Sequence, residues 1–428
     1  MSERVNMERK GLTVETDPCG CDERTGVCGL VPVSEAILKG VALAKEVHEA
    51  EMVTLEAAIG RVIGHDLHAP FALPPFDNSA MDGYALRSAD FTGNGPWRFS
   101  VTGRVAAGDD AAAAGVVGSG EAFRIFTGAA IPAGADAVIM QEHVTRVGDV
   151  IEIKKPVSCK SCIRLTGEDA QKGNLLLPKG TLVGAREIGA IASVGLPEIS
   201  VRRKLRIGLF CSGSELRQPG EPLNPGQIYN SNRFMMLAML RHPWTDVTDY
   251  GAIEDDPGLL RHALAKAAKE VDIIVTIGGV SVGEEDHMVT QLRQAGGDIE
   301  VMKPGKPLSI GRLHNAVFIG LPGNPVAAFT TWKIIGAQIA ARAAGLRTSE
   351  LQRPLVEAAQ TTTRRPGRQE FRPARIVGVS KAGYPKVELL DHSFSAKISL
   401  ICQSDGFAVI PAEIQNIRSG DHLEFVYL

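Results

Sequence analysis

The stretch Val271–Met288 constrains the fold of this chain more than any other segment. Its first half, Val271–Ile277, is a near-continuous apolar run rich in β-branched residues, which is typical of a strand buried on both faces of a parallel sheet. Glycines follow, and the acids Glu284-Glu285-Asp286 then lead into a predicted helix. Strand, glycine turn, acids and helix together indicate the carboxyl end of a sheet strand, where open α/β sheets bind ligands.

The glycine turn does not match two common nucleotide-binding motifs. The residue after Gly283 is an acid, so the lysine of a P-loop is missing, and the glycines do not have Gly-x-Gly-x-x-Gly spacing. Acidic side chains beside a turn that could hold a phosphate would repel that anion, unless a divalent cation lies between the acids and the phosphate. The alternative interpretation is that the acids only favour the amino end of the helix through its dipole.

Two lysines follow this turn at close spacing. Lys303 and Lys306 lie on a backbone stiffened by Pro304 and Pro307, and residues 317–325 form another predicted strand that ends in a Gly/Pro turn. Acids on one turn and lysines on another suit a phosphate ligand together with its metal ion. A solvated surface loop is the alternative interpretation for the lysines.

Six segments identify a family. The chain contains, in this order, PPFDNSAMDGYA, FTGAAIPAGADAVIMQE, GEDAQKG, TIGGVSVGEED, KPGKP and GLPGNP. Together they resemble the MoeA family of molybdenum cofactor biosynthesis, which includes the E domain of gephyrin. The resemblance covers about Val31 to the carboxyl terminus.

Length and charge narrow the class of protein. At 428 residues the chain is too long for one core, and two to four domains are expected. A net charge of −3, from 46 basic and 49 acidic residues, gives no global attraction for nucleic acid or an anionic membrane. No apolar run approaches the roughly 20 residues of a spanning helix, and the amino terminus lacks the core of a signal peptide. We therefore expect a cytoplasmic protein.

The seven cysteines do not suggest a secreted disulfide framework, because their number is odd and they are scattered. Five of them are candidate ligands for zinc or an iron–sulfur cluster, since thiolates are soft ligands: Cys19, Cys21, Cys28, Cys159 and Cys162. Their spacing matches no standard ligand pair, so plain reduced cysteines are the other interpretation.

The hydrophobic pattern divides the chain into parts. We predict a flexible tail over 1–29, a helical region from residue 30 that Ser34 caps, a β-rich domain over 75–172, an α/β domain over 204–349 and a β domain over 350–428. Alternating strands and helices over 204–349 predict a doubly wound, mostly parallel sheet. The resemblance implies that this α/β domain is MogA-like and binds molybdopterin, that 30–74 and 173–203 form one discontinuous domain of an elongated molecule, and that the last domain is barrel-like.

Three carboxylates are candidate metal ligands. Glu215, Asp255 and Asp286 each follow a different predicted strand of the α/β domain. Because such strand ends meet at one edge of the sheet, we expect the three side chains to lie close together. They can hold Mg²⁺, which needs only one or two protein oxygens beside water and phosphate.

The resemblance assigns further site residues. It implies catalytic roles for Asp82, Thr127 and Asp169 beside the three carboxylates. It implies substrate or oxyanion binding by Ser281, Gly283, Lys303, Lys306, Pro307, Asn324, Arg372 and Ser395. Taken alone, Asp82, Thr127 and Asp169 are also compatible with ordinary turn chemistry.

The reaction that the resemblance implies is molybdenum insertion. Molybdate replaces the adenylate of adenylylated molybdopterin with Mg²⁺ present, and AMP is released. Lysines and a cation would offset the substrate's charge, so no protein nucleophile is required. The family also implies a homodimer whose site lies between two chains, and it allows contacts with other enzymes of cofactor biosynthesis.

Some positions depart from the family pattern. Ala327 stands where many members have serine, Ser214 replaces a common aspartate, and Ile299 stands where a lysine is often found. Residues 164–166 are also less basic than usual. These departures leave undecided which residues bind the oxyanion. The sequence does not distinguish molybdate from tungstate as the substrate, because the two anions have the same charge and nearly the same size.

Two other functions remain open at this point. One is a related adenylyltransferase that prepares molybdopterin, because such proteins share the α/β domain; the three additional domains argue against it. The other is an assembly scaffold, since gephyrin is also one. Retention of all three acids and both lysines argues against a purely structural role.

Overall fold

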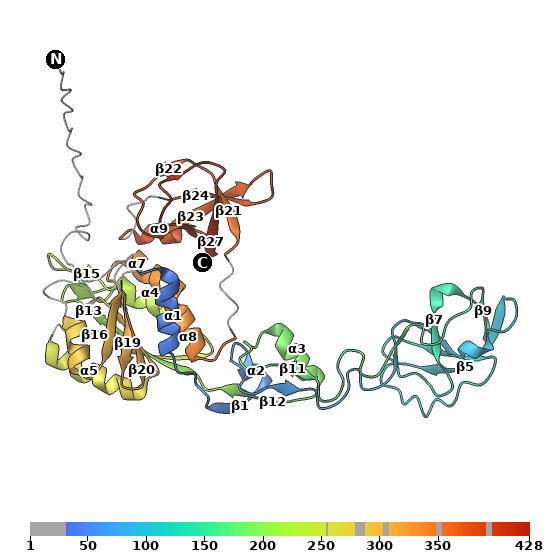
Figure 1. Cartoon of the computed structure of the whole chain (residues 1–428). Coiled ribbons are helices and arrows are strands. Elements are labelled where there is room, and N and C mark those ends of the chain that lie inside the picture. The colour runs from blue at the N-terminus through green and yellow to red at the C-terminus, as the bar shows by residue number, and fades with distance from the viewer. Residues whose placement is uncertain (1–30, 254–255, 279–286, 303–307, 348–352, 391–395) are drawn as a thin grey trace, which may run out of the picture. The chain divides into compact units, whose positions relative to one another are not determined.

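The computed structural model describes residues 31–253, 256–278, 287–302, 308–347, 353–390 and 396–428. Within these residues the chain forms two compact units (Figure 1). One unit contains residues up to Val47 together with Lys204–Leu428, and the other contains His48–Arg203.

A six-stranded sheet forms the centre of the first unit. Its strand order is β16-β13-β17-β20-β19-β18. The strands are β13 (Leu205–Ser212), β16 (Thr245–Ile253), β17 (Ile273–Ile277), β18 (Asp298–Met302), β19 (Leu308–Leu313) and β20 (Ala316–Leu321). The first four in this order are parallel, and β19 and β18 complete the sheet as antiparallel strands. The predicted, mostly parallel α/β sheet is confirmed.

Both faces of this sheet are covered, and strand β17 shows why. Its residues Ile273, Val275 and Ile277 belong to one hydrophobic core, whereas Ile274 belongs to the core on the opposite face. Helices α4 (Ser231–Leu240), α7 (Pro325–Thr331) and α8 (Ala337–Ala343) pack on the first face, and a π-helical turn, Trp332–Gly336, joins the last two. Helices α5 (Pro257–Glu270) and α6 (His287–Gln294) pack on the second. Alternate side chains of a strand point to opposite faces, so an uninterrupted apolar run is needed here.

Helix α1 (Val33–Leu43) packs against the α/β sheet. Its buried residues Val33 and Ala36 join the core shared with α8 and β19, and α1 lies in the first compact unit. The predicted cap at Ser34 is wrong, because the first helical hydrogen bond runs from Ala36 N to Pro32 O and Pro32 is the N-cap residue.

The carboxyl-terminal residues of the first unit form a closed barrel, as predicted. Its strands, in barrel order, are β21 (Leu355–Ala358), β24 (Pro385–Leu389), β23 (Glu370–Val379), β25 (Gly406–Ile410) and β27 (His422–Tyr427). Short strands β22 (Thr362–Thr363) and β26 (Asn416–Ile417) pair beside it, and helix α9 (Ile398–Cys402) precedes β25. Val356, Ala374, Val387, Ala408 and Phe425 lie in the barrel core.

The second unit contains a mixed six-stranded sheet of order β7-β4-β6-β5-β9-β8. Its strands are β4 (Gly83–Leu86), β5 (Trp97–Val105), β6 (Glu121–Ile125), β7 (Ala137–Met140), β8 (Val144–Val147) and β9 (Val150–Ile153). Strands β5 and β6 are parallel, and the other pairs are antiparallel. Two hydrophobic clusters flank this sheet, one around Phe99 and one around Phe123.

The remainder of the second unit joins segments that are distant in sequence. Strand β1 (Ala50–Thr54) pairs with β12 (Glu198–Arg202), and β2 (Leu67–His68) pairs with β11 (Leu175–Leu177). Helices α2 (Leu55–Ala58) and α3 (Ala185–Ser193) cover a small core that includes Ile63, Val183 and Ile191.

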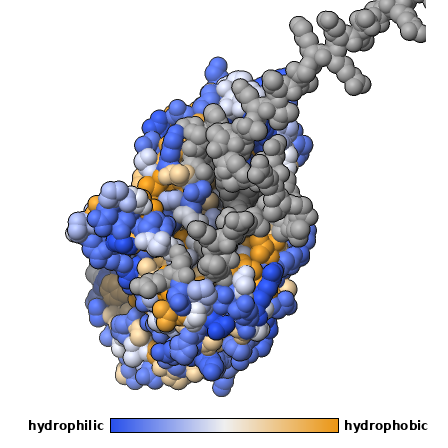
Figure 2. Space-filling view, turned by 90° about the vertical axis from the view of Figure 1, so that its left-hand side faces the viewer, coloured by the Kyte–Doolittle hydropathy of each residue, from blue (hydrophilic) through white to orange (hydrophobic). Residues whose placement is uncertain are grey.

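The face shown in Figure 2 is mostly hydrophilic, with separated hydrophobic patches. Among the described residues, no helix has the length and apolar character needed to cross a membrane.

Candidate functional site

Three strand ends converge at the carboxyl edge of the α/β sheet. The Gly278 N–H, directly after β17, donates to Leu321 O at the end of β20 (3.1 Å). Gly278 has a φ of +82°, and a Cβ added there would lie 2.9 Å from Ser212 O at the end of β13. A side chain would therefore collide with the neighbouring strand, and glycine allows the close approach that the sequence pattern predicts.

Glu215 lies in the loop after β13 at this edge. Its carboxylate folds back over Gly213, where an added Cβ would lie 2.5 Å from Glu215 Oε2 and where φ is +148°. Its carbonyl accepts from Ile228 N (3.0 Å), which ties the loop to the small pair of strands β14 (Leu216–Arg217) and β15 (Ile228–Tyr229). Among the described residues, the exposed Glu215 carboxylate has no hydrogen-bond or ion-pair partner. A solvated, unpaired carboxylate on a fixed loop fits a ligand for a hard divalent cation.

Asn324 is the second predicted residue at this edge. It is the N-cap residue of α7, yet its side chain makes no capping hydrogen bond. Nearby, Asn232 Nδ2 donates to Gly323 O (2.6 Å), while the buried Asn232 Oδ1 has no partner among the described residues. Within the described residues, the Asn324 side-chain amide and the Asn232 Oδ1 atom of α4 are therefore polar groups at this edge that remain available to a ligand.

Many predicted site residues lie outside the described residues: Asp255, Ser281, Gly283, Asp286, Lys303, Lys306, Pro307 and Ser395, as well as Cys19, Cys21 and Cys28. In the part of the chain that is described, no three His, Cys, Asp or Glu side chains gather as a metal site would require. The magnesium triad therefore stays a prediction in which Glu215 is the member whose position is known.

Two of the departures from the family pattern lie at buried positions. Ile299 lies on β18, is 5% exposed and packs in the hydrophobic core against α5 and α6. Ala327 is 7% exposed on α7. Both side chains are thus part of the packed interior in this chain.

Arg372, predicted to bind an oxyanion, lies on β23 and is 2% exposed. Its Nε donates to Glu370 Oε1 (2.8 Å), and its Nη2 donates to Glu370 Oε2 (3.1 Å). Arg364 Nε lies 3.3 Å from Glu370 Oε2, so two buried guanidinium groups share one carboxylate. Burial lowers the pKa of Arg364, and the neighbouring Glu370 opposes this. An incoming oxyanion would have to compete with Glu370 for Arg372.

In the second unit the structure brings Asp82 and Thr127 together. Asp82 precedes β4, Thr127 follows β6, and these strands are antiparallel neighbours. Asp82 Oδ1 accepts from both Thr127 N and Thr127 Oγ1, each at 2.8 Å. These two hydrogen bonds lower the pKa of Asp82, and Arg124 adds a smaller effect in the same direction. Asp82 is therefore held as a carboxylate in one orientation.

We call the two hydrogen bonds from Thr127 to Asp82 a clamp. A second clamp of the same kind lies five residues earlier, at Asp77. Asp77 Oδ1 accepts from Thr166 N and Oγ1, each at 2.7 Å, and these bonds lower the pKa of Asp77. Residues 77–82, which include the short strand β3 (Asn78–Ser79), are thus fixed at both ends. The exposed Asp169 lies on the adjoining loop, where its N–H donates to Leu73 O (3.0 Å). Its side chain forms no hydrogen bond with Asp82 or Thr127.

Two arginines beside the Asp82 clamp are not singled out by sequence analysis. Arg104 on β5 and Arg124 on β6 are register partners. Both guanidinium groups lie against the Phe126 ring, with Cζ 4.9 Å and 4.7 Å from its centroid. A sequence signal exists for Arg124 alone, which precedes the aromatic Phe126 by two positions and so shares its face; Arg104 is followed two positions later by Ala106 and carries no such signal.

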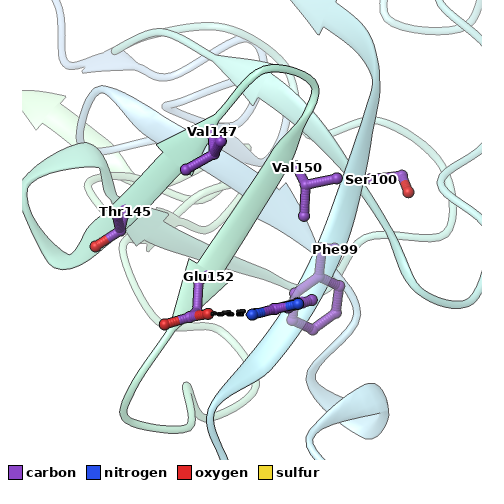
Figure 3. Close-up of a pocket in the computed structure, with 7 residues that line it drawn as sticks. Phe99, Ser100, Thr145, Val147, Val150 and Glu152 are labelled. Carbon is purple, nitrogen blue, oxygen red and sulfur yellow. Dashed lines mark hydrogen bonds and ion pairs between the residues drawn. The ribbon is translucent and has the colours of Figure 1, made fainter.

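The hollow drawn in Figure 3 lies elsewhere in this unit. It has a volume of about 510 Å³ and is lined by residues of β5, β8 and β9, including Phe99, Thr145 and Val150. Arg98 and Glu152, register partners on β5 and β9, both line it and form an ion pair at 3.1 Å. It contains none of the predicted site residues, so we do not assign the site to it.

Cys159 and Cys162 are free thiols, the first exposed and the second half-buried. The Cys159 side chain hydrogen-bonds to Asp136. Burial raises the pKa of Asp136, but the two hydrogen bonds from Ser88, together with weaker ones that include the Cys159 bond, lower it by more, so the net shift is downward. The metal-binding interpretation of this pair stays a prediction.

Comparison with known proteins gives a consistent result along the sequence. Residues 31–195 match the MoeA N-terminal region (domain I and II), residues 208–341 match a probable molybdopterin binding domain, and residues 356–428 match the MoeA C-terminal region (domain IV).

Individual relatives are similar over most of their length. The molybdopterin molybdenumtransferase of Haemophilus influenzae is 34% identical over 87% of this chain and 92% of that protein. Molybdopterin molybdenumtransferase 2 of Mycobacterium tuberculosis is 33% identical over 87% and 93%. The crystal structure of the molybdopterin biosynthesis moeA protein of Pyrococcus horikoshii OT3 superimposes with a TM-score of 0.77 at 28% identity, covering 94% of this chain and 100% of that one.

Proposed function

The chain belongs to the MoeA family, and we propose that it is a molybdopterin molybdenumtransferase that inserts molybdenum into adenylylated molybdopterin. Molybdate would displace the adenylate, and AMP would be released in a Mg²⁺-dependent step. The proposal includes a homodimer in the cytoplasm, because the family resemblance implies a site shared between two chains.

The unpaired Glu215 carboxylate at the carboxyl edge of the sheet is the observation that carries this proposal. It lies where an open α/β sheet binds its ligand, and its oxygens are free within the described residues. Such a carboxylate fits Mg²⁺, which when bound would withdraw charge from the phosphoryl group. Asp255 and Asp286 would complete the ligand set.

The remaining groups would bind and orient the substrate. The side-chain amide of Asn324, which makes no capping hydrogen bond in the described part of the chain, can donate to a phosphate or oxyanion at the same edge. Lys303 and Lys306 would offset the negative charge of the substrate, and the clamped Asp82 would present a fixed carboxylate. Positioning and charge stabilisation suffice for a transfer between oxyanions, so no covalent intermediate with the protein is needed.

The test is AMP release from adenylylated molybdopterin with molybdate, measured across a range of Mg²⁺ concentrations. Glu215→Gln keeps the size of the side chain but removes one anionic ligand, so the Mg²⁺ concentration for half-maximal rate should rise at least about tenfold. Asp246→Asn is the control, because Asp246 is exposed near the amino end of β16, at the opposite edge of the sheet.

Three outcomes separate this function from the alternatives. Adenylylated product formed from molybdopterin and ATP would support an adenylyltransferase. A protein that neither forms this product nor releases AMP would support a scaffold. If Glu215→Gln releases AMP with molybdate and needs no more Mg²⁺ than the unaltered protein, the proposed reaction stands but Glu215 is not a Mg²⁺ ligand.

A further inference from the structure

We propose that Arg104, held against Phe126 beside Arg124, binds an anionic tetrahedral group of the substrate on the β-rich sheet of the second unit. This inference rests on the proposed function, because the substrate of that reaction carries phosphate groups and reacts with an oxyanion. None of the residues assigned from the motifs includes this arginine pair.

The register of the sheet creates the site. Tyr84 on β4, Arg124 on β6 and Arg104 on β5 are successive register partners across three neighbouring strands, so their side chains emerge on one face. Phe126 follows Arg124 by two positions and lies on the same face. The four side chains form what we call the arginine–aromatic row.

The two arginines differ in how they are held. The half-buried Arg124 lies 5.2 Å from the Tyr84 ring centroid as well as 4.7 Å from that of Phe126. Its Nη1 donates to Gly83 O (3.0 Å), and its Nη2 donates to Gln141 Oε1. Most of its donors are therefore committed, and its charge is shared with the nearby Asp82.

Arg104 is exposed, and its guanidinium lies over the Phe126 ring. Its Cζ lies 4.9 Å from the Phe126 centroid, and within the described residues its guanidinium has no hydrogen-bond or ion-pair acceptor. Like charges at directly opposed positions destabilise a sheet, and the nearby acid Asp82 is already bonded to Thr127. An anion bound on the solvent side of the row would relieve the repulsion between the Arg104 and Arg124 guanidinium groups.

The geometry suits a phosphate-like group. A guanidinium stacked on an aromatic ring keeps its planar edge of N–H donors free, and that edge matches two oxygens of a tetrahedral anion. Phe126 restricts the side chain before the ligand arrives, which reduces the entropy lost on binding. The row also lies next to the Asp82–Thr127 clamp, because Thr127 directly follows Phe126 and Asp82 precedes Gly83.

The experiment compares Arg104→Gln with Arg98→Gln in the full-length protein. Arg98 is exposed on the same strand and pairs with Glu152 at the hollow of Figure 3, so both variants lose one positive charge from β5. Binding of AMP and of molybdate is measured separately by titration calorimetry at low salt. Arg124 is not varied, since its loss would also free Gly83 O at the start of β4.

We expect Arg104→Gln to weaken binding of one anion by about tenfold, the effect of losing a charge-assisted contact, with an unchanged melting temperature. Weaker AMP binding identifies the phosphate of the nucleotide as the group bound, and weaker molybdate binding identifies the oxyanion. Arg104→Lys keeps the charge but not the planar edge, and should restore only part of the affinity.

The inference is overturned if Arg104→Gln binds both anions as tightly as the unaltered protein, if Arg98→Gln loses as much affinity, or if the unaltered protein binds neither anion. The proposed function is judged separately, by whether the unaltered protein releases AMP. Loss of anion affinity without any AMP release would therefore support the site and reject the reaction.

Discussion

The pair Asp82–Thr127 shows how one threonine can fix both the ionised state and the orientation of a carboxylate. Both donors come from Thr127, one from its backbone and one from its side chain. The lowered pKa of Asp82 means that the clamp contributes stability above the unfolded pKa and loses it as the pH falls through the folded pKa. The Asp82 carboxylate is thus ionised throughout the neutral range.

We predict that Thr127→Val raises the pKa of Asp82 towards its usual value of 3.8, because the hydroxyl donor is lost while the backbone donor remains. The protonation of Asp82 then moves to higher pH. Titration of the carboxyl carbon signals by NMR measures this, with Asp82→Asn to assign the signal. AMP release should fall at the same time, since the carboxylate is less firmly oriented.

Thr166→Val is the matched control for this prediction, because Thr166 holds Asp77 through the same two donors. It should raise the pKa of Asp77 and leave that of Asp82 unchanged. An Asp82 signal that titrates identically in Thr127→Val and the unaltered protein would contradict the role of the hydroxyl.

Single residues also show what sequence patterns can and cannot locate. The motif around Asp82 and Thr127 pointed to two residues that do meet, although 45 positions separate them. Arg104 and Arg124 were missed because their pairing depends on a parallel register that shifts between Val101 and Gly103. Such a bulge is set by the packed sheet and leaves no clear mark in the sequence.

At the scale of elements, strand β23 separates its charges by face. Glu370 and Arg372 lie two positions apart, on the same face, and both take part in the largely buried group with Arg364. Arg375, further along the strand, forms an exposed pair with Glu388 of β24 at 2.7 Å. The first pair is buried and joined by two hydrogen bonds within one strand, whereas the second is exposed and joined by one hydrogen bond between neighbouring strands.

We predict that Glu370→Gln lowers the free energy of unfolding by about 3 kcal/mol, because two buried guanidinium groups lose their shared carboxylate. Glu388→Gln is the control and should cost at most about 1 kcal/mol, since its pair is solvated. Chemical denaturation of both variants provides the comparison. Equal costs would show that the buried group is no more important to the barrel than an exposed ion pair.

Elements differ in how far the sequence determines them. Val271–Ile277 predicted a strand buried on both faces, and β17 is such a strand, because only that environment accommodates an unbroken apolar run. The apolar spacing of α1 predicted a helix but not its partner. Gly40 shows the missing information: an added Cβ would lie 2.3 Å from Ile339 Cδ1, so this glycine reflects contact with α8, some 300 residues away. An amphipathic pattern states that one face is buried but not against which core.

At the scale of the whole chain, residues 48–203 have the character of an insertion into the first unit. The chain leaves that unit after Val47 and returns at Lys204. The outgoing and returning segments run side by side, because β1 and β12 are antiparallel with Ala50 opposite Arg202, and Arg203 N donates to Glu49 O (2.9 Å). Neighbouring ends of this kind are typical of domain insertions.

We predict that joining Val47 to Lys204 through a short Gly/Ser linker gives a folded protein, because α1 and the six-stranded sheet keep their shared core. Cooperative thermal unfolding and the far-ultraviolet circular dichroism spectrum measure this. The shortened protein should retain any Mg²⁺ binding that depends on Glu215 but release no AMP, since it lacks Asp82, Thr127 and Arg104. An unfolded product would reject the insertion, whereas undiminished AMP release would show that the carboxyl edge of the α/β sheet carries the whole reaction without the second unit.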